Sequence, residues 1–361
     1  MNRSPRFLAW LAAVLALSFA LAGCAGGDGT PASGDATGGD GGAAAGGEAA
    51  ADAGDGGAGE PAEGAAASDP PSLGIATGGT SGTYYPLGGG LAQIFTDAGF
   101  HATAESTGAS VENMQLLKEN DVDLAFTQSD IADYASKGTV MFEDGGAVGN
   151  LTAVASLYNE TIQIVVSADS DIRSVEDLAG KRVSIGAPGS GTELNAIQIL
   201  EAHGMTTDDL GETQRLAFGD STAYIQDGTL DAAFVTAGTP TAAVSELAAT
   251  KGVRIVHIEP EKIDALIAKY PFYAKQEVPG GTYAGFDETV TTVAVKAQLV
   301  ARAELSEGLV YGLTKALFEN LERMRSVHAK AAEITLEGAL EGVSLTVHPG
   351  AAKYYEEQGI R

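Results

Sequence analysis

Short apolar segments alternate with segments of helical periodicity along most of this chain. The apolar run 73–76 is followed by a glycine-rich stretch, 78–90, and then by residues 91–95, where apolar side chains recur at helical spacing. We therefore expect a strand, a loop and a helix that starts near Pro86, because proline suits the first turn of a helix. Repeated strand and helix segments of this kind indicate an α/β fold.

The chain repeats this succession of segments in its second half. Gly82 precedes Asp123 by 41 positions, and Gly191 precedes Asp231 by 40. Both intervals end in the sequence Asp-x-Ala-Phe within a strand pattern. Each interval also holds a helical pattern that a serine is expected to open, namely Ser110 and Ser221. The matched spacing predicts a duplicated β-α-β plan.

Two such halves predict two α/β lobes with a cleft between them. In open α/β folds, ligands bind where strand ends and helix N-termini converge. The β-rich segment 151–166 is expected to cross from the first lobe to the second, and 290–295 is expected to cross back. Two crossings make a hinge. We predict a first lobe of residues 73–160 plus 295–361 and a second lobe of residues 161–294.

Residues 1–23 have the pattern of an export signal. Two arginines precede an apolar run, 7–22, which ends at Leu21-Ala22-Gly23-Cys24 and resembles a bacterial lipobox. Cleavage before Cys24 and lipidation of its thiol would anchor the chain to the membrane on its extracytoplasmic side. The alternative is an uncleaved membrane anchor, for which the run is short. Residues 24–72 contain no aromatic, branched aliphatic or basic residue, so we expect a disordered tether.

Composition and charge argue against several classes of function. The formal net charge of −27 disfavours nucleic acid and anionic membrane surfaces as partners. The five histidines have no H-E-x-x-H or other paired spacing, no G-x-S-x-G occurs, and the single cysteine is assigned to the lipid. We therefore expect no catalysis, no metal site and no cofactor.

The first glycine-rich loop is a candidate for binding a small anion. Its glycines let backbone N–H groups converge, and Thr80, Ser81 and Thr83 add hydroxyl groups just before a helix. The alternative is a glycine-rich turn packed on a neighbouring strand. The loop has neither Gly-Lys-Ser/Thr nor G-x-G-x-x-G, so the sequence does not indicate a nucleotide site.

The second glycine-rich loop, 186–193, has the glycine spacing of a phosphate loop. Thr192 and Glu193, however, occupy the positions of lysine and serine or threonine in such a loop, and a carboxylate there would repel phosphate. Glu193 suits the ammonium group of a ligand. Alternatively, it only complements the positive end of the following helix.

Several short motifs of the chain occur in one order between residues 73 and 360. They are Ala76-Thr77-Gly78-Gly79-Thr80 through Tyr84-Tyr85-Pro86, Gly108-Ala109-Ser110-Val111-Glu112-Asn113, Ala187-Pro188-Gly189-Ser190-Gly191-Thr192-Glu193, Tyr270-Pro271-Phe272-Tyr273, Pro279-Gly280-Gly281-Thr282-Tyr283 and His348-Pro349-Gly350-Ala351. In these motifs the chain resembles the solute-binding receptors of tripartite ATP-independent periplasmic (TRAP) transporters, specifically the TAXI type.

The resemblance implies a type II periplasmic-binding-protein fold that closes around a small carboxylate such as glutamate, glutamine or 2-oxoglutarate. It also implies that the ligand is handed to a TRAP membrane permease driven by an ion gradient. Ser81 and Thr83 stand where many members have glycine and an aliphatic residue, which leaves the ligand's identity open. Apart from the resemblance, the same fold suits the binding protein of an ABC importer or a sensor that presents its ligand to a membrane kinase.

The ligand-binding residues are predicted at the starts of helices and the ends of strands. The full set is Thr80, Ser81, Gly82, Thr83 and Tyr84 around one carboxylate, Ser190, Gly191 and Thr192 at the facing helix, Gln128, Ser129 and Thr236 after the two Asp-x-Ala-Phe strands, Glu193 for an amino group, and Tyr283. One of Tyr84 and Tyr85 is expected to face the cleft. Phe126 and Phe234 are expected in the core, because their strands have the composition of buried strands.

Overall fold

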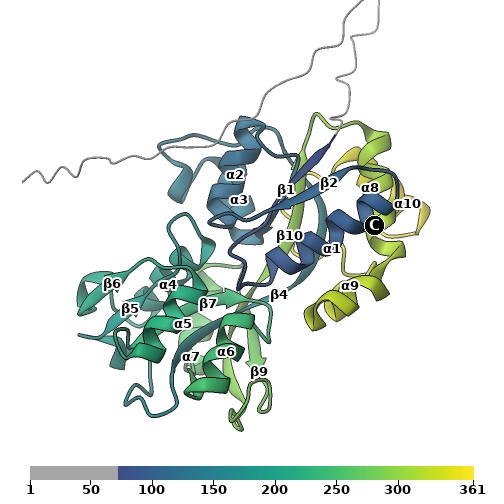
Figure 1. Cartoon of the computed structure of the whole chain (residues 1–361). Helices are drawn as coiled ribbons and strands as arrows, with labels where there is room; N and C mark the ends of the chain where they lie inside the picture. Colours follow the sequence, from purple (N-terminus) through teal and green to yellow (C-terminus); the bar gives the residue numbers. More distant parts are fainter. Residues whose placement is uncertain (1–71) are drawn as a thin grey trace, which may run out of the picture. The chain divides into compact units, whose positions relative to one another are not determined.

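A computed structural model describes residues 72–361 of the chain (Figure 1). The predicted signal segment 1–23, the predicted lipidation site Cys24 and the predicted tether as far as residue 71 lie outside the described residues. Within 72–361, no helix combines the length and the apolar character that a membrane crossing requires.

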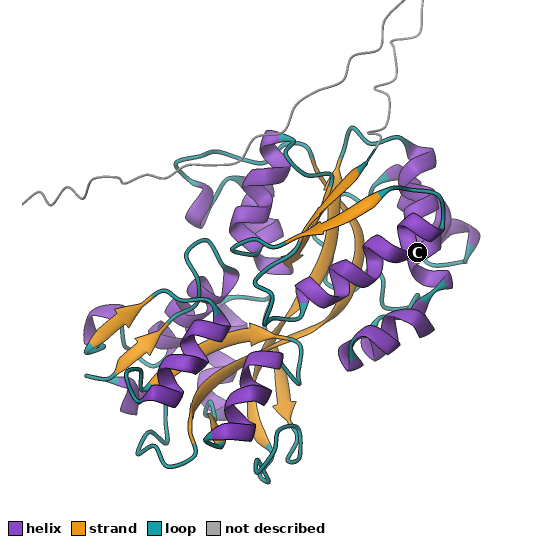
Figure 2. Ribbon diagram, in the orientation of Figure 1, coloured by secondary structure: helices purple, strands orange, loops and turns teal. Residues whose placement is uncertain are grey.

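The ten strands of residues 72–361 form one mixed sheet (Figure 2). The strand order is β2-β1-β3-β10-β4-β7-β5-β6, with β8 also paired to β4 and β9 to β10. Strand β1 pairs in parallel with β2 and β3, and β5 pairs in parallel with β6 and β7. The bounds are β1 (Leu73–Ala76), β2 (Ala102–Glu105), β3 (Leu124–Gln128), β4 (Leu151–Ser167), β5 (Arg182–Ser184), β6 (Glu212–Gln214), β7 (Ala232–Ala237), β8 (Val253–Val256), β9 (Ala274–Val278) and β10 (Val290–Arg302).

Strands β4 and β10 are long and antiparallel, and they run through both parts of the sheet. The first part of β10, from Val290 to Ala294, pairs with β9, whereas Ala297 to Ala301 pairs with β3. Strand β4 pairs with β7 through residues 161–165. The predicted crossings are therefore confirmed, and β10 continues beyond residue 295 because its residues stay largely buried as far as Ala301.

Helices cover both parts of the sheet (Figure 1). The α-helices are α1 (Tyr84–Asp97), α2 (Ser110–Glu119), α3 (Ser129–Lys137), α4 (Gly191–Ala202), α5 (Phe218–Asp227), α6 (Ala242–Thr250), α7 (Pro260–Lys269), α8 (Glu307–Glu319), α9 (Leu321–Val327) and α10 (Pro349–Glu357). Short 3-10 helices are η1 (Val140–Phe142), η2 (Glu176–Leu178), η3 (Thr207–Asp209) and η4 (Ala329–Glu333).

Separate apolar clusters fill the two lobes. Phe126 belongs to a cluster around α1, α8 and α10, and Phe234 belongs to one around β7, α4 and α7. Both phenylalanines are fully buried, as the sequence predicted. Leu194 of α4 belongs to the same apolar cluster as Met114 of α2, so the lobes also touch through apolar side chains. The lobe boundaries near residues 160 and 294 remain a prediction, because β4 and β10 are continuous there.

Candidate functional site

A cavity of about 70 Å³ lies between the two lobes. A volume of this size has room for several water molecules. The first lobe contributes Gly78, Gly79, Gly82, Thr83, Tyr84, Thr107, Gly108, Ala109, Ser110 and Gln128, strand β4 contributes Glu160, and the second lobe contributes Ala187, Ser190, Gly191, Thr192, Ala217, Phe218, Thr236 and Ala237.

The first residues of four helices line this cavity. They are Tyr84 of α1, Ser110 of α2, Gly191 of α4 and Phe218 of α5. The first N–H groups of a helix have no partner inside the helix, and the helix dipole is positive at this end. Four such ends around one cavity favour a negatively charged group of a ligand.

Helix α5 begins at Phe218, and the prediction that Ser221 opens it is wrong. The Ser221 hydroxyl is buried and donates a hydrogen bond of 2.9 Å to the Ser184 hydroxyl of β5. It therefore holds the helix against the sheet and does not cap it. The helix starts three residues earlier, which brings Phe218 to the cavity. Helix α2 does start at Ser110, whose hydroxyl oxygen accepts the N–H of Gln128 at 3.2 Å.

The absence of a side chain at Gly191 gives Gln128 its place at the cavity. A Cβ atom at Gly191 would lie 2.0 Å from Oε1 of Gln128, far inside van der Waals contact. The Oε1 atom of Gln128 is buried and has no hydrogen-bond partner among the described residues. It is a free acceptor beside the cavity, and a buried acceptor of this kind costs free energy until a donor reaches it.

Glu160 brings a buried carboxyl group to the same cavity. The residue is 2% exposed, and the Tyr84 hydroxyl donates a hydrogen bond of 2.6 Å to its Oε2. Burial raises the pKa of Glu160 to about 8, although the Tyr84 hydrogen bond lowers it. Burial and the nearby Glu160 carboxylate also raise the pKa of Tyr84 well above its usual value. A cationic group in the cavity would favour the ionised form of Glu160.

A second buried carboxyl group, that of Asp130, lies behind the cavity at the junction of the lobes. Asn195 of α4 donates to Oδ2 of Asp130 at 3.2 Å, and Thr236 donates to Oδ1 of Asn195 at 3.1 Å. Burial raises the pKa of Asp130 to about 7, and the neighbouring Asp133 adds to this effect. The Oδ1 atom of Asp130 has no partner among the described residues.

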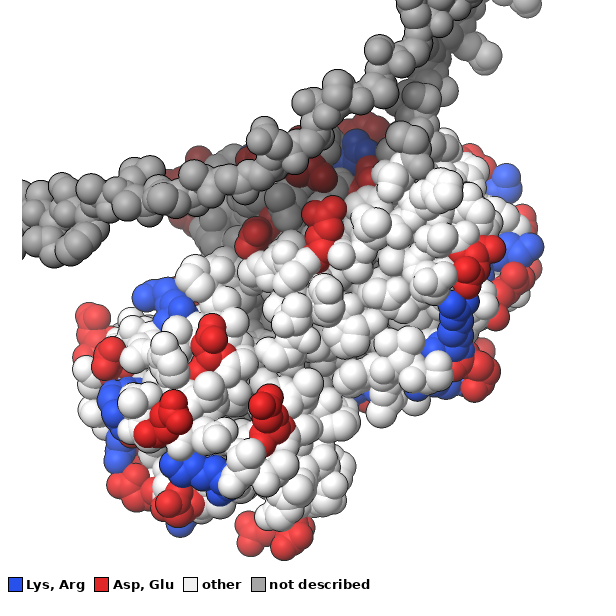
Figure 3. Space-filling view, viewed as in Figure 1, with Lys and Arg blue, Asp and Glu red and all other residues white. Residues whose placement is uncertain are grey.

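Direct hydrogen bonds also join the lobes around the cavity. The Thr83 hydroxyl donates to the Gly238 carbonyl at 3.1 Å, and the backbone N–H of Val111 donates to the Gly189 carbonyl at 3.1 Å. On the face shown in Figure 3, the middle of the molecule is largely free of charged side chains, which gather at its periphery. These hydrogen bonds hold the two lobes in contact beside the cavity.

Eight of the predicted ligand-binding residues line the cavity. These are Gly82, Thr83, Tyr84, Gln128, Ser190, Gly191, Thr192 and Thr236. Tyr84 is buried and faces the cavity, whereas Tyr85 is 37% exposed. The structure therefore brings both glycine-rich loops and both strand ends together, while their role in binding remains a prediction.

Five predicted residues lie outside the lining of this cavity. Thr80 is exposed, Ser81 is half-buried and Ser129 is buried. The Glu193 carboxylate forms an ion pair of 2.6 Å with Arg215. The Tyr283 hydroxyl donates to Oε1 of Gln163 at 2.5 Å inside the second lobe. The pairing with Arg215 favours the helix-start interpretation of Glu193 over the ligand-ammonium interpretation.

Sequence reasoning missed Glu160. It belongs to the crossing strand β4, which is otherwise apolar or uncharged from Leu151 to Ser167. Charged residues are rarely fully buried unless they have a partner, so an acidic residue inside such a strand was the available signal. Away from the cavity, the structure also brings together three residues that could hold a metal ion, Glu176, His203 and Glu259.

Solved structures of binding proteins resemble this chain at low sequence identity. PhnD1 from Prochlorococcus marinus in complex with methylphosphonate matches with a TM-score of 0.50 and 12% identity, over 80% of this chain and 97% of that chain. The alkanesulfonate-binding protein SsuA from Xanthomonas axonopodis pv. citri matches with a TM-score of 0.45 and 14% identity, over 76% of this chain and 86% of that chain. A putative L-cystine ABC transporter from Listeria monocytogenes matches with a TM-score of 0.45 and 14% identity, over 73% of this chain and 98% of that chain.

The fold is that of periplasmic solute-binding proteins, which confirms the predicted two-lobe fold. More particularly, a family model matches residues 75–359, and the chain belongs to the NMT1-like family. The TAXI type is a finer assignment than this family, and it remains a prediction.

Proposed function

We propose that this protein is an extracytoplasmic solute-binding protein that captures a small amino acid, with glutamate or glutamine as the first candidates. One observation carries the proposal: four helix N-termini and the buried carboxyl group of Glu160 face the same small cavity. The first feature suits a carboxylate and the second suits an ammonium group. An α-amino acid carries both groups on the same carbon atom.

The carboxylate of the ligand would bind at the helix N-termini. The backbone N–H groups of Ser110, Gly191 and Thr192 are the natural donors, because the Thr83 hydroxyl is already bound to Gly238 and the Val111 N–H to Gly189. A hydrogen bond to a charged acceptor contributes roughly 1.5–3 kcal/mol. Two or three such bonds are enough to replace the water that the carboxylate loses on entry.

The ammonium group would bind between Glu160 and Gln128. An ammonium group has three donors and no acceptor, and it would satisfy the free Oε1 of Gln128. It would also neutralise the Glu160 carboxylate, whose burial otherwise favours the protonated form. A keto acid such as 2-oxoglutarate would bring only acceptors to the same place, so we expect it to bind more weakly.

The test compares L-glutamate with 2-oxoglutarate by calorimetry, because the two share a carbon skeleton and differ in the ammonium group. We expect L-glutamate to bind at least about tenfold more tightly, a difference of about 1.4 kcal/mol. The preference should be lost in Glu160→Gln and kept in the control Glu246→Gln, which changes an exposed glutamate of the second lobe. A stronger response to 2-oxoglutarate, to methylphosphonate or to a neutral sugar would contradict the proposal.

We further propose that the captured solute is delivered to a TRAP membrane permease and that acylated Cys24 holds the protein at the membrane. The TAXI-type motifs support the first statement and the lipobox pattern supports the second. An ABC importer or a ligand-presenting sensor would need the same cavity. A neighbouring gene for a TRAP membrane subunit would support delivery to a TRAP permease, and neighbouring genes for an ATPase and its permease would contradict it. Cys24→Ser should leave an uncleaved precursor in cells, so normal maturation would argue against the anchor.

A further inference from the structure

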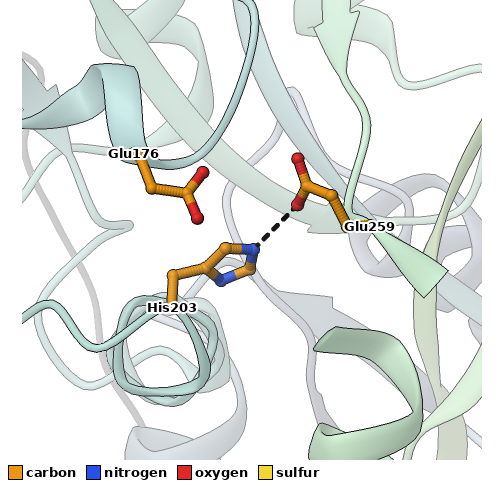
Figure 4. A group of neighbouring side chains, drawn as sticks. All are labelled: Glu176, His203 and Glu259. Atoms are coloured by element: carbon orange, nitrogen blue, oxygen red, sulfur yellow. Dashed lines mark hydrogen bonds and ion pairs between the residues drawn. The ribbon is translucent and has the colours of Figure 1, made fainter. Parts of the chain in front are cut away.

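Three side chains with the donor atoms of a metal site meet in the second lobe, away from the cavity. Glu176 is the first residue of η2, His203 follows the last residue of α4, and Glu259 directly precedes α7. One ligand atom from each lies within 4.8 Å of the others. Figure 4 shows the two carboxylates directed at the imidazole ring from two sides.

The contacts of His203 determine which nitrogen of its ring carries the hydrogen. The His203 side chain is fully buried, and its Nδ1 lies 2.7 Å from the carbonyl oxygen of Ile199. A carbonyl oxygen only accepts, so Nδ1 carries a hydrogen and the neutral ring presents a lone pair on Nε2. That Nε2 lies 3.2 Å from Oε2 of Glu259. Two acceptors at this distance need a cation between them, either a proton on the ring or a metal ion.

The donor set and its charge favour a metal ion. One imidazole nitrogen and two carboxylate oxygens are ligands that Zn²⁺ accepts, and a tetrahedral site with bonds near 2.0–2.1 Å separates its ligands by about 3.4 Å. Nε2 of His203 and the Glu259 carboxylate already have nearly this separation. The exposed side chain of Glu176 is free to move the remaining distance. The two carboxylates balance the charge of a divalent ion.

The surroundings of the three residues favour a bound cation. His203 lies at the C-terminal end of α4, where the helix dipole is negative, and the ammonium group of Lys262 binds the Ala202 carbonyl at the same end. The hydrogen bond from Nδ1 to a backbone carbonyl is the usual second-shell support of a metal-ligating histidine. Helix α4 has 12 residues, so about 18 Å separates this end from the cavity at Gly191.

We propose that Glu176, His203 and Glu259 form a binding site for a divalent transition-metal ion, with Zn²⁺ as the preferred ion and water as the fourth ligand. The ion fastens η2, the end of α4 and the start of α7 to one another, and it thereby stabilises the second lobe. The site is separate from the solute cavity, and it does not depend on the identity of the solute. Sequence patterns did not predict this site, because its three residues lie in three distant segments.

The test is a calorimetric titration of the full-length Cys24→Ser chain with ZnCl₂, after treatment with EDTA and without a histidine tag. The Cys24→Ser background removes the single thiol of the chain. We expect one Zn²⁺ per chain and a higher melting temperature with Zn²⁺, with no comparable effect of Mg²⁺. Glu176→Gln should weaken Zn²⁺ binding at least about tenfold, and His203→Gln should abolish it. The control His101→Gln changes an exposed histidine of the first lobe and should leave Zn²⁺ binding unchanged.

Glu176 decides the outcome, because its side chain is exposed and its replacement does not disturb a buried group. The proposal is overturned if the parent chain shows no saturable Zn²⁺ binding, since a proton on His203 then accounts for the contact with Glu259. It is also overturned if Glu176→Gln binds Zn²⁺ as tightly as the parent chain. Circular dichroism of His203→Gln separates loss of the metal ligand from loss of the fold.

Discussion

The Asp123 carboxylate accepts the backbone N–H of Gly74 at 2.9 Å and thereby joins the segment before β3 to β1. The second lobe repeats this contact, because the Asp231 carboxylate accepts the backbone N–H of Arg182 at 2.8 Å. In both pairs the residues are 49 positions apart. The two Asp-x-Ala-Phe motifs therefore share a structural role: the aspartate fixes a parallel strand pair, and the phenylalanine that follows is buried.

Replacing Asp123 by alanine should destabilise the protein strongly. Asp123 also forms an ion pair with Arg302, and both side chains are largely buried, with 10% and 17% exposed. Removal of one partner leaves the other charge buried without compensation, a loss of about 3–5 kcal/mol. Asp231→Ala should cost less, because its pair with Arg182 is more exposed.

Thermal unfolding of Asp123→Ala and Asp231→Ala tests whether the first variant is the more destabilised. The matched control is Glu201→Ala, which removes an exposed ion pair with Lys269 and should change the free energy of unfolding by no more than about 1 kcal/mol. If Asp123→Ala has the same melting temperature as the control and the parent chain, the buried ion pair of Asp123 and Arg302 does not stabilise the fold.

Local patterns were enough to predict much of the fold. The apolar run 73–76 is β1, and β3 and β7 begin directly after the aspartate of each Asp-x-Ala-Phe motif. The glycines and Pro86 located the first helix, which starts at Tyr84. Periodicity, turn residues and strand composition are properties of neighbouring residues, and these features depend on little else.

The candidate site was predicted only in part, because side-chain partners depend on distant segments. Tyr84 meets Glu160 across 76 positions, and Glu193 meets Arg215 across 22. Nothing near Glu160 in the sequence shows which side of β4 faces the cavity. The start of α5 was misplaced for a similar reason, since the serine that resembled a cap is bonded to another strand.

Titration of Glu160 and Asp130 should lower the stability of the protein without ligand as the pH rises from about 5 to 8. Burial raises the pKa of Glu160 from 4.5 to about 8 and that of Asp130 to about 7. Over this range the folded state holds protons that the unfolded state has lost, so raising the pH favours unfolding. Each group contributes at most about 1.4 kcal/mol per pH unit inside its own window.

Melting temperatures at pH 5 to 9 measure this effect, and Glu160→Gln isolates one of the two groups. Glutamine does not titrate and still offers an oxygen to Tyr84, so the variant should show a smaller fall between pH 5 and 8. If the melting temperature falls equally with pH in the variant and in the parent chain, Glu160 keeps an ordinary pKa in the folded state.

Gly191→Ala should abolish or greatly weaken the binding of L-glutamate. The new Cβ would lie 2.0 Å from Oε1 of Gln128 and would push this side chain out of its place at the cavity. The control is Gly308→Ala in α8, where an added Cβ meets no atom within 4 Å. In a helix this change should be neutral or stabilising by up to about 1 kcal/mol. Unchanged calorimetric affinity in Gly191→Ala would remove the Gln128 amide from the binding site.

Tyr84→Phe should shift the pH dependence of L-glutamate binding without removing the cavity. The Tyr84 hydrogen bond lowers the pKa of Glu160, so its loss raises that pKa and leaves less of the carboxylate ionised at pH 7. Because the proposed contact with an ammonium group needs the ionised form, affinity should fall at pH 7. It should recover towards the parent value near pH 9, where a larger share of Glu160 is ionised in both proteins than at pH 7.

Calorimetry of Tyr84→Phe at pH 7 and pH 9 separates this explanation from a simple loss of contact. If the Tyr84 hydroxyl binds the ligand directly, its removal weakens binding equally at both pH values. If Tyr84 acts through the Glu160 carboxyl group, the loss of affinity at pH 7 should grow about tenfold for each unit by which the pKa of Glu160 rises. Affinity should also recover at pH 9. Binding that is the same in both proteins at both pH values would contradict a role for this pair in recognition of the ammonium group.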